Sequence, residues 1–198
     1  MHQSLAWLLT PDTMLTARMA QQAGQTVAQL AHRNVVLETV HDNTVETIKT
    51  AATDRTKAVI LVHQVGMPAD IGAVRALCDE RGWTLIEDAA CAIGSTFNGK
   101  PIGQHSDFVV FSFHPRKLLT TGEGGMVMTT RDELADRMVR LRQHGMSVSA
   151  ADRHASKKVV LETYDEMGFN FRMTDMQAAM GLAQLSKIDA IIARRREI

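Results

Sequence analysis

Short apolar runs recur along the chain, and each has a length that suits a single β-strand. The runs cover residues 34–40, 57–66, 83–88, 107–114 and 125–130, and they are rich in valine, isoleucine, leucine and phenylalanine. The run at 57–66 is apolar at nearly every position, which is typical of a strand buried on both faces. We therefore predict a strand in each segment, the runs at 83–88, 107–114 and 125–130 being buried ones.

Helical spacing fills the segments between these runs. Apolar residues recur every three or four positions in 42–54, 68–82, 131–145 and 174–198. Two of these segments end in a glycine, Gly82 and Gly145, which is a helix stop signal. The last segment is expected to be one long helix capped by Thr174 or Asp175. The stretch 147–167 has weak periodicity and is expected to be a mobile excursion.

This alternation predicts an α/β fold in three layers, with a mostly parallel sheet that helices cover on both faces. The length of 198 residues fits one large domain. In such sheets ligands bind beyond the carboxyl ends of the strands. Three positions lie at such ends, namely Asp88, Ser112 and the turn that holds Lys117.

Charge and cysteine content narrow the classes of partner. Lysine plus arginine equals aspartate plus glutamate, 22 of each, so no basic excess points to nucleic acid or an anionic membrane. No apolar stretch is long enough to span a membrane. The two cysteines lack CxxC spacing, which favours a reducing compartment and makes the cytoplasm the expected location. The eight histidines are scattered, so we expect no metal site.

Lys117 stands in a glycine-rich turn between two apolar runs, within the stretch "FSFHPRKLLTTGEGGMVMTT" at 111–130. An amine in that place should be partly desolvated, which disfavours its ammonium form and suits a lysine that forms a Schiff base. The ordinary alternative is an exposed lysine at the rim of a loop, and most lysines are exposed.

Other candidates each have an ordinary alternative. Asp88 ends a strand, and its carboxylate suits a cationic ring nitrogen of a cofactor, or else caps a helix. Ser112 offers a hydroxyl to a phosphate, or else bonds to the backbone. Cys91 is a possible nucleophile, although a small buried thiol is the expected role. The sequence "TTGEGG" at 120–125 matches no established phosphate-loop motif.

The order of these motifs resembles a known enzyme family. The sequences "EDAACAIGSTFNGKPIG", "SDFVVFSFHPRKLLTTGEGGMVMTT", "LRQHG" and "MGFNFRMTDMQAAMGLAQL" look like the DegT/StrS sugar aminotransferases. Those enzymes depend on pyridoxal 5'-phosphate and have the aspartate-aminotransferase fold, type I. The resemblance is specific from about residue 56 onward and thinner before it.

The resemblance implies a role for five residues. Lys117 would form the imine with the cofactor and later shuttle protons, while Asp88 would hold the pyridine nitrogen protonated. Ser112 would bind the cofactor phosphate. Asn170 matches an asparagine that relatives extend from the partner subunit to the same phosphate, so a homodimer is implied. Cys91 occupies a cofactor-adjacent position that is often glutamine or histidine in relatives.

The resemblance also implies a reaction, the transfer of an amino group from an amino acid, expected to be glutamate, to a keto sugar nucleotide. Lys117 favours this over the family's dehydratases, which carry a histidine at that position. Those dehydratases remain an alternative. A further alternative is a truncated, non-catalytic large domain that binds a partner or dimerises. A nicotinamide-binding module is set aside because no glycine fingerprint follows the first strand.

Departures from the family pattern concern the ends of the chain. Residues 1–198 are expected to form the cofactor-binding large domain, incomplete at the N-terminus and without the smaller C-terminal domain. Relatives commonly have Thr-Pro and then an aromatic residue where this chain has Thr16, Ala17 and Gln21. Aromatic stacking on the cofactor is therefore expected to be missing.

Overall fold

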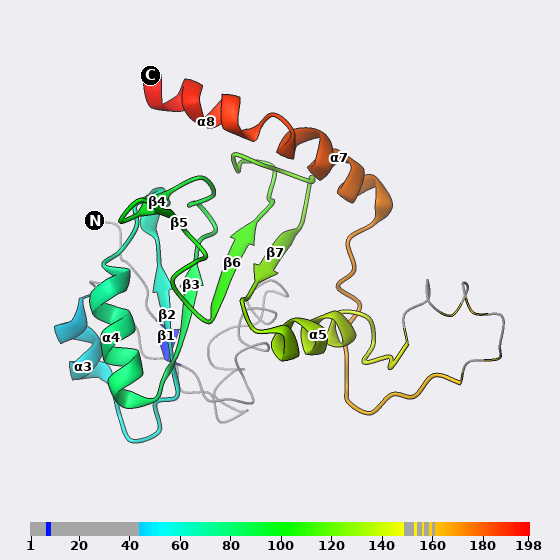
Figure 1. Ribbon diagram of the computed structural model, residues 1–198, viewed down its shortest axis with the longest axis horizontal. Coiled ribbons are helices and arrows are strands. Elements are labelled where there is room, and N and C mark those ends of the chain that lie inside the picture. Colours follow the sequence, from blue (N-terminus) through cyan, green and yellow to red (C-terminus); the bar gives the residue numbers. More distant parts are fainter. Residues whose placement is uncertain (1–6, 9–43, 149–152, 154–155, 157–158, 160) are drawn as a thin grey trace.

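A five-stranded sheet forms the centre of the molecule in the computed structural model, which describes residues 7–8, 44–148, 153, 156, 159 and 161–198 (Figure 1). A separate two-stranded hairpin lies beside it. The strands of the sheet are β1 (Trp7–Leu8), β2 (Ala58–Val62), β3 (Thr84–Asp88), β6 (Phe108–Ser112) and β7 (Gly125–Met128), and those of the hairpin are β4 (Thr96–Phe97) and β5 (Lys100–Pro101).

The sheet has the order β1-β2-β3-β6-β7. Strands β2, β3 and β6 are parallel, with Val62 opposite Asp88 and Asp88 opposite Val110. The edge strands β1 and β7 run antiparallel to their neighbours. The predicted α/β class with a mostly parallel sheet is confirmed, and the register brings the carboxyl ends of β2, β3 and β6 to one edge.

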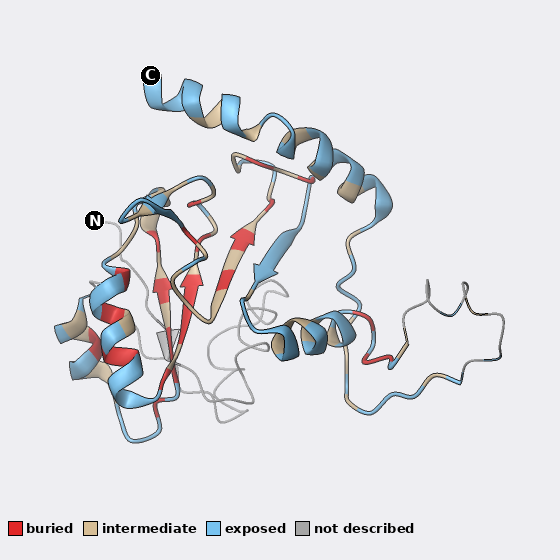
Figure 2. Cartoon of the chain, viewed as in Figure 1, coloured by how far each residue is buried: buried red, intermediate tan, exposed pale blue. Residues whose placement is uncertain are grey.

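Helices α3 (Val45–Ala51) and α4 (Ile71–Arg81) cover one face of this sheet. Their apolar side chains meet alternate residues of the central strands, and Figure 2 shows burial concentrated there. Helix α4 begins at the cap Asp70 and ends at Gly82 in the left-handed region, which was the predicted stop. The buried core of this layer contains Ile48, Val59, Leu61, Ile71, Val74, Leu77, Cys78, Leu85 and Val109. A helical layer on the second face stays a prediction.

Three further helices lie away from that core: α5 (Asp132–Leu141), α7 (Asp175–Leu185) and α8 (Ile188–Glu197). Figure 1 shows α7 and α8 crossing above the carboxyl ends of the strands, with α5 beyond β7. Within the described residues, no helix is long and apolar enough to cross a membrane.

The prediction of a single helix at 174–198 is wrong, because the helix is interrupted at Ser186 and Lys187, which separate α7 from α8. The Ser186 hydroxyl donates a hydrogen bond to the Ala183 carbonyl, a side-chain bond that competes with regular helix. The break redirects α8 onto the turn at Gly94, where a side chain on that glycine would collide with Ile192. The predicted cap at Thr174 is confirmed.

Strand β7 also differs from expectation, since all four of its residues are exposed rather than buried. It is an edge strand, and none of the described elements covers it. The strand predicted at 57–66 stops at Val62, and a 3₁₀ turn, η1 (Gln64–Gly66), follows it. The strand expected at 34–40 lies outside the described residues, as does part of the 147–167 segment.

An ion pair fastens α4 to the start of β6. Arg75 Nη1 lies 2.9 Å from Asp107 Oδ2, and the same carboxylate oxygen accepts a hydrogen bond from the Leu85 amide at 3.1 Å. Burial by itself raises the pKa of Asp107, but these hydrogen bonds and the nearby positive charge outweigh it and leave that pKa below its ordinary value.

We expect Asp107→Asn to lower the free energy of unfolding at pH 7 by about 1.5–3 kcal/mol, because it removes a charge-assisted hydrogen bond. A carboxyl with a depressed folded-state pKa stabilises the protein above its unfolded pKa, about 3.9, and loses this effect as the pH falls through the folded value. Urea unfolding from pH 7 to pH 3 should therefore show the two proteins converging. Asp136→Asn, at an exposed position of α5, is the control. An equal loss at pH 3 would contradict this account.

Candidate active site

The loop that carries Lys117 joins β6 to β7 as an antiparallel hairpin. Ser112 pairs with Gly125, and the Phe113 amide donates to the Gly124 carbonyl at 2.9 Å. The Thr121 amide returns a hydrogen bond to the Phe113 carbonyl at 3.1 Å. The chain therefore reverses direction over the glycine-rich stretch, as its sequence suggested, and the base of the loop is pinned.

Lys117 is half-buried, so the alternative of a fully exposed lysine at the rim of the loop does not describe it. Its amide donates to the His114 carbonyl at 2.9 Å, which forms a tight turn. Its Nζ lies 2.9 Å from Sγ of Cys91. This contact joins the β6–β7 loop to the turn that follows β3, although the two residues are far apart in sequence.

Asp88 is the last residue of β3, in the middle of the sheet. Its Oδ1 accepts a hydrogen bond from the Ala90 amide at 3.0 Å, which fixes the carboxylate in a turn. Residues 89–95 contain no helix, so the alternative role as a helix cap does not hold. Side chains alternate along a strand, so Asp88 points away from the face that α3 and α4 cover.

Ser112 ends β6 on the same face as Asp88, because Asp88 is opposite Val110 and Ser112 follows two residues later. Its Oγ accepts a hydrogen bond from the His114 amide at 3.3 Å. The alternative predicted for Ser112, a hydrogen bond between its hydroxyl and the backbone, is thus present. Lys117 follows in the loop above, so the structure brings a carboxylate, a hydroxyl and an amine to one edge.

Cys91 is exposed, so the expected role as a small buried thiol is wrong for this cysteine. The physical reason is its place in an open turn beyond β3, where the Lys117 amine lies 2.9 Å from its sulfur. Cys78, on the inner side of α4, is the buried thiol.

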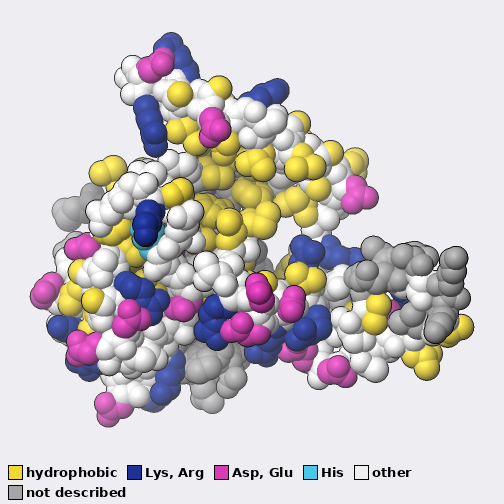
Figure 3. Space-filling model, in the orientation of Figure 1, with side chains coloured by type: hydrophobic (Ala, Val, Ile, Leu, Met, Phe, Trp, Pro, Cys, Tyr) yellow, Lys and Arg dark blue, Asp and Glu magenta, His cyan; other side chains and the backbone are white. Residues whose placement is uncertain are grey.

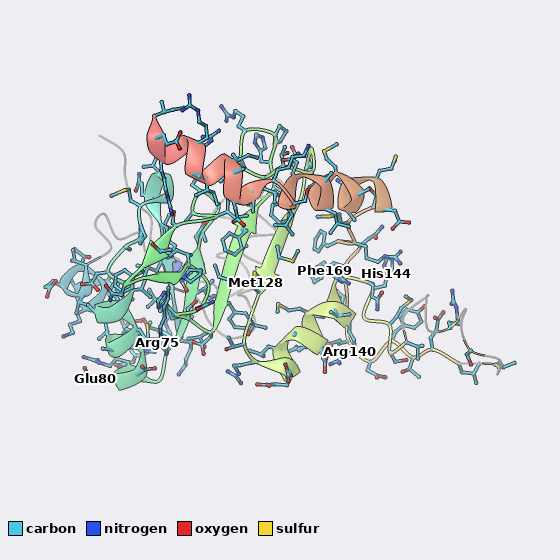
Figure 4. All side chains as sticks on the ribbon, turned by 45° about the horizontal axis from the view of Figure 1, so that its top comes forward. Arg75, Glu80, Met128, Arg140, His144 and Phe169 are labelled. Carbon is cyan, nitrogen blue, oxygen red and sulfur yellow. The ribbon has the colours of Figure 1, made fainter. Side chains whose placement is uncertain are left out.

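Asn170 does not join this group of side chains. Its backbone bridges to Gln143, its side chain is exposed, and the adjacent Phe169 carbonyl accepts a hydrogen bond from the His144 amide at 2.8 Å. Figure 4 shows Phe169 and His144 between α5 and α7, on the far side of β7 from the central strands. Gly145 permits this contact, because a side chain there would collide with the Glu166 carbonyl.

A buried polar group beneath Asp88 was missed by the sequence reasoning. His63 and Glu87 are both buried, with His63 Nε2 2.8 Å from Glu87 Oε2. The Ala69 amide donates to His63 Nδ1 at 3.2 Å, which leaves Nε2 as the protonated nitrogen that donates to Glu87. Ser106 donates to the other oxygen of Glu87.

This group links the carboxyl ends of β2 and β3 to the segment that enters β6. His63 follows β2, Glu87 lies in β3 and Ser106 precedes β6. The His63 amide also donates to the Asp88 carbonyl at 3.0 Å. Each polar atom is matched, as a buried polar network requires. The signal in the sequence was a glutamate inside an apolar strand, next to the candidate Asp88.

The two cysteines should differ in reactivity toward iodoacetamide at pH 8. Burial raises the pKa of Cys78 to about 11, so roughly one molecule in 1,000 would carry its thiolate at that pH, whereas Cys91 is exposed. We expect Cys91 to be alkylated at least a hundred times faster, measured by peptide mass spectrometry. Both should react alike in urea, which serves as the control. Equal rates in the folded chain would contradict the burial of Cys78.

Comparisons with known proteins bear on the family and the fold of this chain. Residues 12–198 match the profile of the DegT/DnrJ/EryC1/StrS aminotransferase family. The GDP-perosamine synthase of Vibrio cholerae is 43% identical over 154 residues, which cover 78% of this chain and 39% of the synthase.

Solved structures show the same relationship. PseC of Helicobacter pylori, an aminotransferase involved in pseudaminic acid biosynthesis, superposes with a TM-score of 0.68 at 29% identity, over 91% of this chain and 45% of PseC. The PLP form of the putative sugar aminotransferase Spr1654 from Streptococcus pneumoniae gives 0.67 at 26% identity, over 77% and 42%. The chain thus spans less than half the length of each. It belongs to the DegT/DnrJ/EryC1/StrS aminotransferase family.

Proposed function

We propose that this chain carries the cofactor-binding part of a pyridoxal-phosphate aminotransferase that delivers an amino group to a keto sugar nucleotide. The observation that carries the proposal is the half-buried residue Lys117 in a pinned loop, at the sheet edge where Asp88 and Ser112 also lie. Family membership supports it, and a 43% identical relative is named for a nucleotide sugar, GDP-perosamine.

The side chains present fit pyridoxal phosphate. The cofactor offers an aldehyde, a pyridine nitrogen and a phosphate, and the edge of the sheet offers an amine, a carboxylate and a hydroxyl from Lys117, Asp88 and Ser112. When bound, the cofactor supplies an electron sink for the carbon that loses a proton. Cys91, beside the Lys117 amine, would line the same site.

The chain's own groups have separable tasks. Lys117 would hold the cofactor covalently through Nζ and, once released, would take and return a proton at the amino-bearing carbon. Asp88 would keep the ring nitrogen protonated, because a fixed carboxylate favours a cation beside it. Its hydrogen bond from Ala90 sets its orientation beforehand. Ser112 would donate its hydroxyl hydrogen to the phosphate.

We further propose a cytoplasmic homodimer in which Asn170 serves the partner's site, with glutamate as amino donor. Asn170 bridges to Gln143 and follows Phe169, which Figure 4 shows between α5 and α7, whereas the Lys117 amine contacts Cys91; this separation supports a contribution of Asn170 to another subunit. An exposed apolar surface on β7 and α7 offers an interface, and Figure 3 shows apolar side chains gathered along α7. The exposed apolar residues of these two elements are Met126, Val127, Met128, Met176, Met180, Leu182 and Leu185, with Val127 on the opposite face of β7 from the two methionines.

The extent of the chain is part of the proposal. We infer that residues 1–198 belong to the large domain of the fold, the smaller C-terminal domain lying outside them. A non-catalytic domain that folds or dimerises is the second candidate, and the cofactor-labelling experiment below separates the two. The dehydratase reaction is disfavoured by the lysine at position 117.

Pyridoxal phosphate added to the full chain should label Lys117 selectively. After borohydride reduction, peptide mass spectrometry should find the pyridoxyl group on Lys117, and a visible absorbance band should precede the reduction. Lys117→Ala should abolish the band, and Asp88→Asn should weaken cofactor binding at least tenfold by removing the charged partner of the ring.

The matched control for this experiment is Lys100→Ala, because Lys100 is an exposed lysine on β5 outside the site. It should leave the band unchanged. Labelling spread evenly over the lysines of the wild-type chain would favour the non-catalytic domain instead.

The exposed apolar surface makes the oligomeric state testable. We expect the wild-type chain to sediment as a dimer and Leu182→Glu to dissociate it by at least tenfold, because a carboxylate would enter an apolar interface. Leu182 is 68% exposed in the single chain, so the substitution has little to disturb in the fold. Ile198→Glu, also exposed, is the control. A wild-type monomer at micromolar concentration would refute the dimer.

A further inference from the structure

Helix α7 holds the loop that carries Lys117 through main-chain groups of that loop. Oε1 of Gln184 accepts a hydrogen bond from the Thr120 amide at 3.0 Å, and its Nε2 donates to the Thr120 carbonyl at 2.9 Å. The Gln184 side-chain amide thus bonds to both the N–H and the C=O of Thr120, as the backbone of a neighbouring strand would. Such a contact fixes the position of the backbone whatever the side chain there.

Two more residues of α7 share this contact, and with Gln184 we call them the docking face (Gln177, Gly181, Gln184). They are spaced four and three positions apart, so they lie on one side of the helix. Gln177 Nε2 donates to the Glu123 carbonyl at 2.9 Å. A side chain at Gly181 would come within 3.1 Å of the Thr121 methyl, so glycine allows the helix to lie close.

The polarity of α7 shows that these contacts are specific to the loop. Its glutamines face the molecule, whereas its apolar residues Met176 and Leu182 are 82% and 68% exposed. An ordinary surface helix has the reverse arrangement. Among the described residues that pack against the core, Met173 and Ile188 flank α7, and none lies within it. Hydrogen bonds to Thr120 and Glu123 therefore define where the loop meets the helix.

The position of Thr120 bears directly on Lys117, three residues before it. Thr120 Oγ1 donates to the Phe113 carbonyl at 2.9 Å, so Phe113 and Thr120 close a short loop around the lysine. A loop of this length cannot shift at Thr120 without moving its other residues. The 2.9 Å contact between Lys117 Nζ and Cys91 Sγ depends on that placement.

We propose that Gln184 is a positioning residue that holds the Lys117 amine against the turn at Cys91 by fixing the backbone of Thr120. Its role toward pyridoxal phosphate rests on the proposed function, whereas its effect on the loop does not. The motif "MTDMQAAMGLAQL" at 173–185 therefore supports the Lys117 loop through Gln177 and Gln184.

The test compares Gln184→Met, which keeps the shape but loses both hydrogen bonds, with Gln184→Glu, which keeps an acceptor for the Thr120 amide. Gln104→Met, at an exposed position on another loop, is the control. Circular dichroism establishes that each variant is folded. Hydrogen exchange then reports on the Thr120 amide. Competitive acetylation followed by mass spectrometry compares the reactivity of Lys117 with that of Lys100. Neither measurement needs a cofactor.

We expect Gln184→Met to speed exchange of the Thr120 amide at least tenfold and to bring the acetylation rate of Lys117 to that of the exposed Lys100. Gln184→Glu should restore most of the protection of the Thr120 amide. Pyridoxal phosphate capture at Lys117 should slow about tenfold in Gln184→Met, with labelling spread to other lysines. Gln104→Met should match the wild type in every measurement.

Unchanged exchange at Thr120 in Gln184→Met would overturn the proposal. So would faster exchange with unchanged acetylation of Lys117, because Gln184 would then support the loop without positioning the amine. If the wild type captures no pyridoxal phosphate while exchange and acetylation both respond to Gln184→Met, the positioning stands and the proposed function fails.

Discussion

Parallel pairing of β3 with β2 and β6 is the constraint on which the rest of the structure depends. It aligns Val62 with Asp88 and Asp88 with Val110, so three strands end together. The buried pair of His63 and Glu87 reinforces this alignment from the helix-covered face, where a mismatched charge would be costly. The candidate chemistry lies on the opposite face of the same strand ends.

Antiparallel β7 has a different consequence for the site. A parallel continuation after β6 would need a long crossover, whereas an antiparallel one needs only a hairpin loop. The Lys117 loop is that hairpin, and it therefore stays next to Ser112 and above Asp88. An edge strand is also open on one side, and the methionines of β7 and the leucines of α7 are exposed in the single chain.

Local sequence predicted the central elements well. Consecutive apolar residues marked β2, β3 and β6, and Gly82 ended α4 as predicted, through cap chemistry that needs no distant contact. The start of α4 was placed three residues too early, at position 68, because the Asp70 side chain caps a helix that begins at Ile71. Local sequence predicted less well those features that depend on contacts between residues far apart in the chain. The break between α7 and α8 accompanies packing of Ile192 over Gly94, and the exposure of Cys91 depends on which elements cover the turn after β3.

The sequence by itself determined the fold class, the strand ends that bear Asp88 and Ser112, and the glycine-rich reversal around Lys117, because hydrophobic periodicity and turn chemistry are local properties. Only the tertiary structure decided that Lys117 meets Cys91, that His63 pairs with Glu87, that Asn170 stands apart, and that Gln184 holds Thr120. Each of these depends on how segments far apart in the chain are brought together, and residue spacing alone carries no information about that.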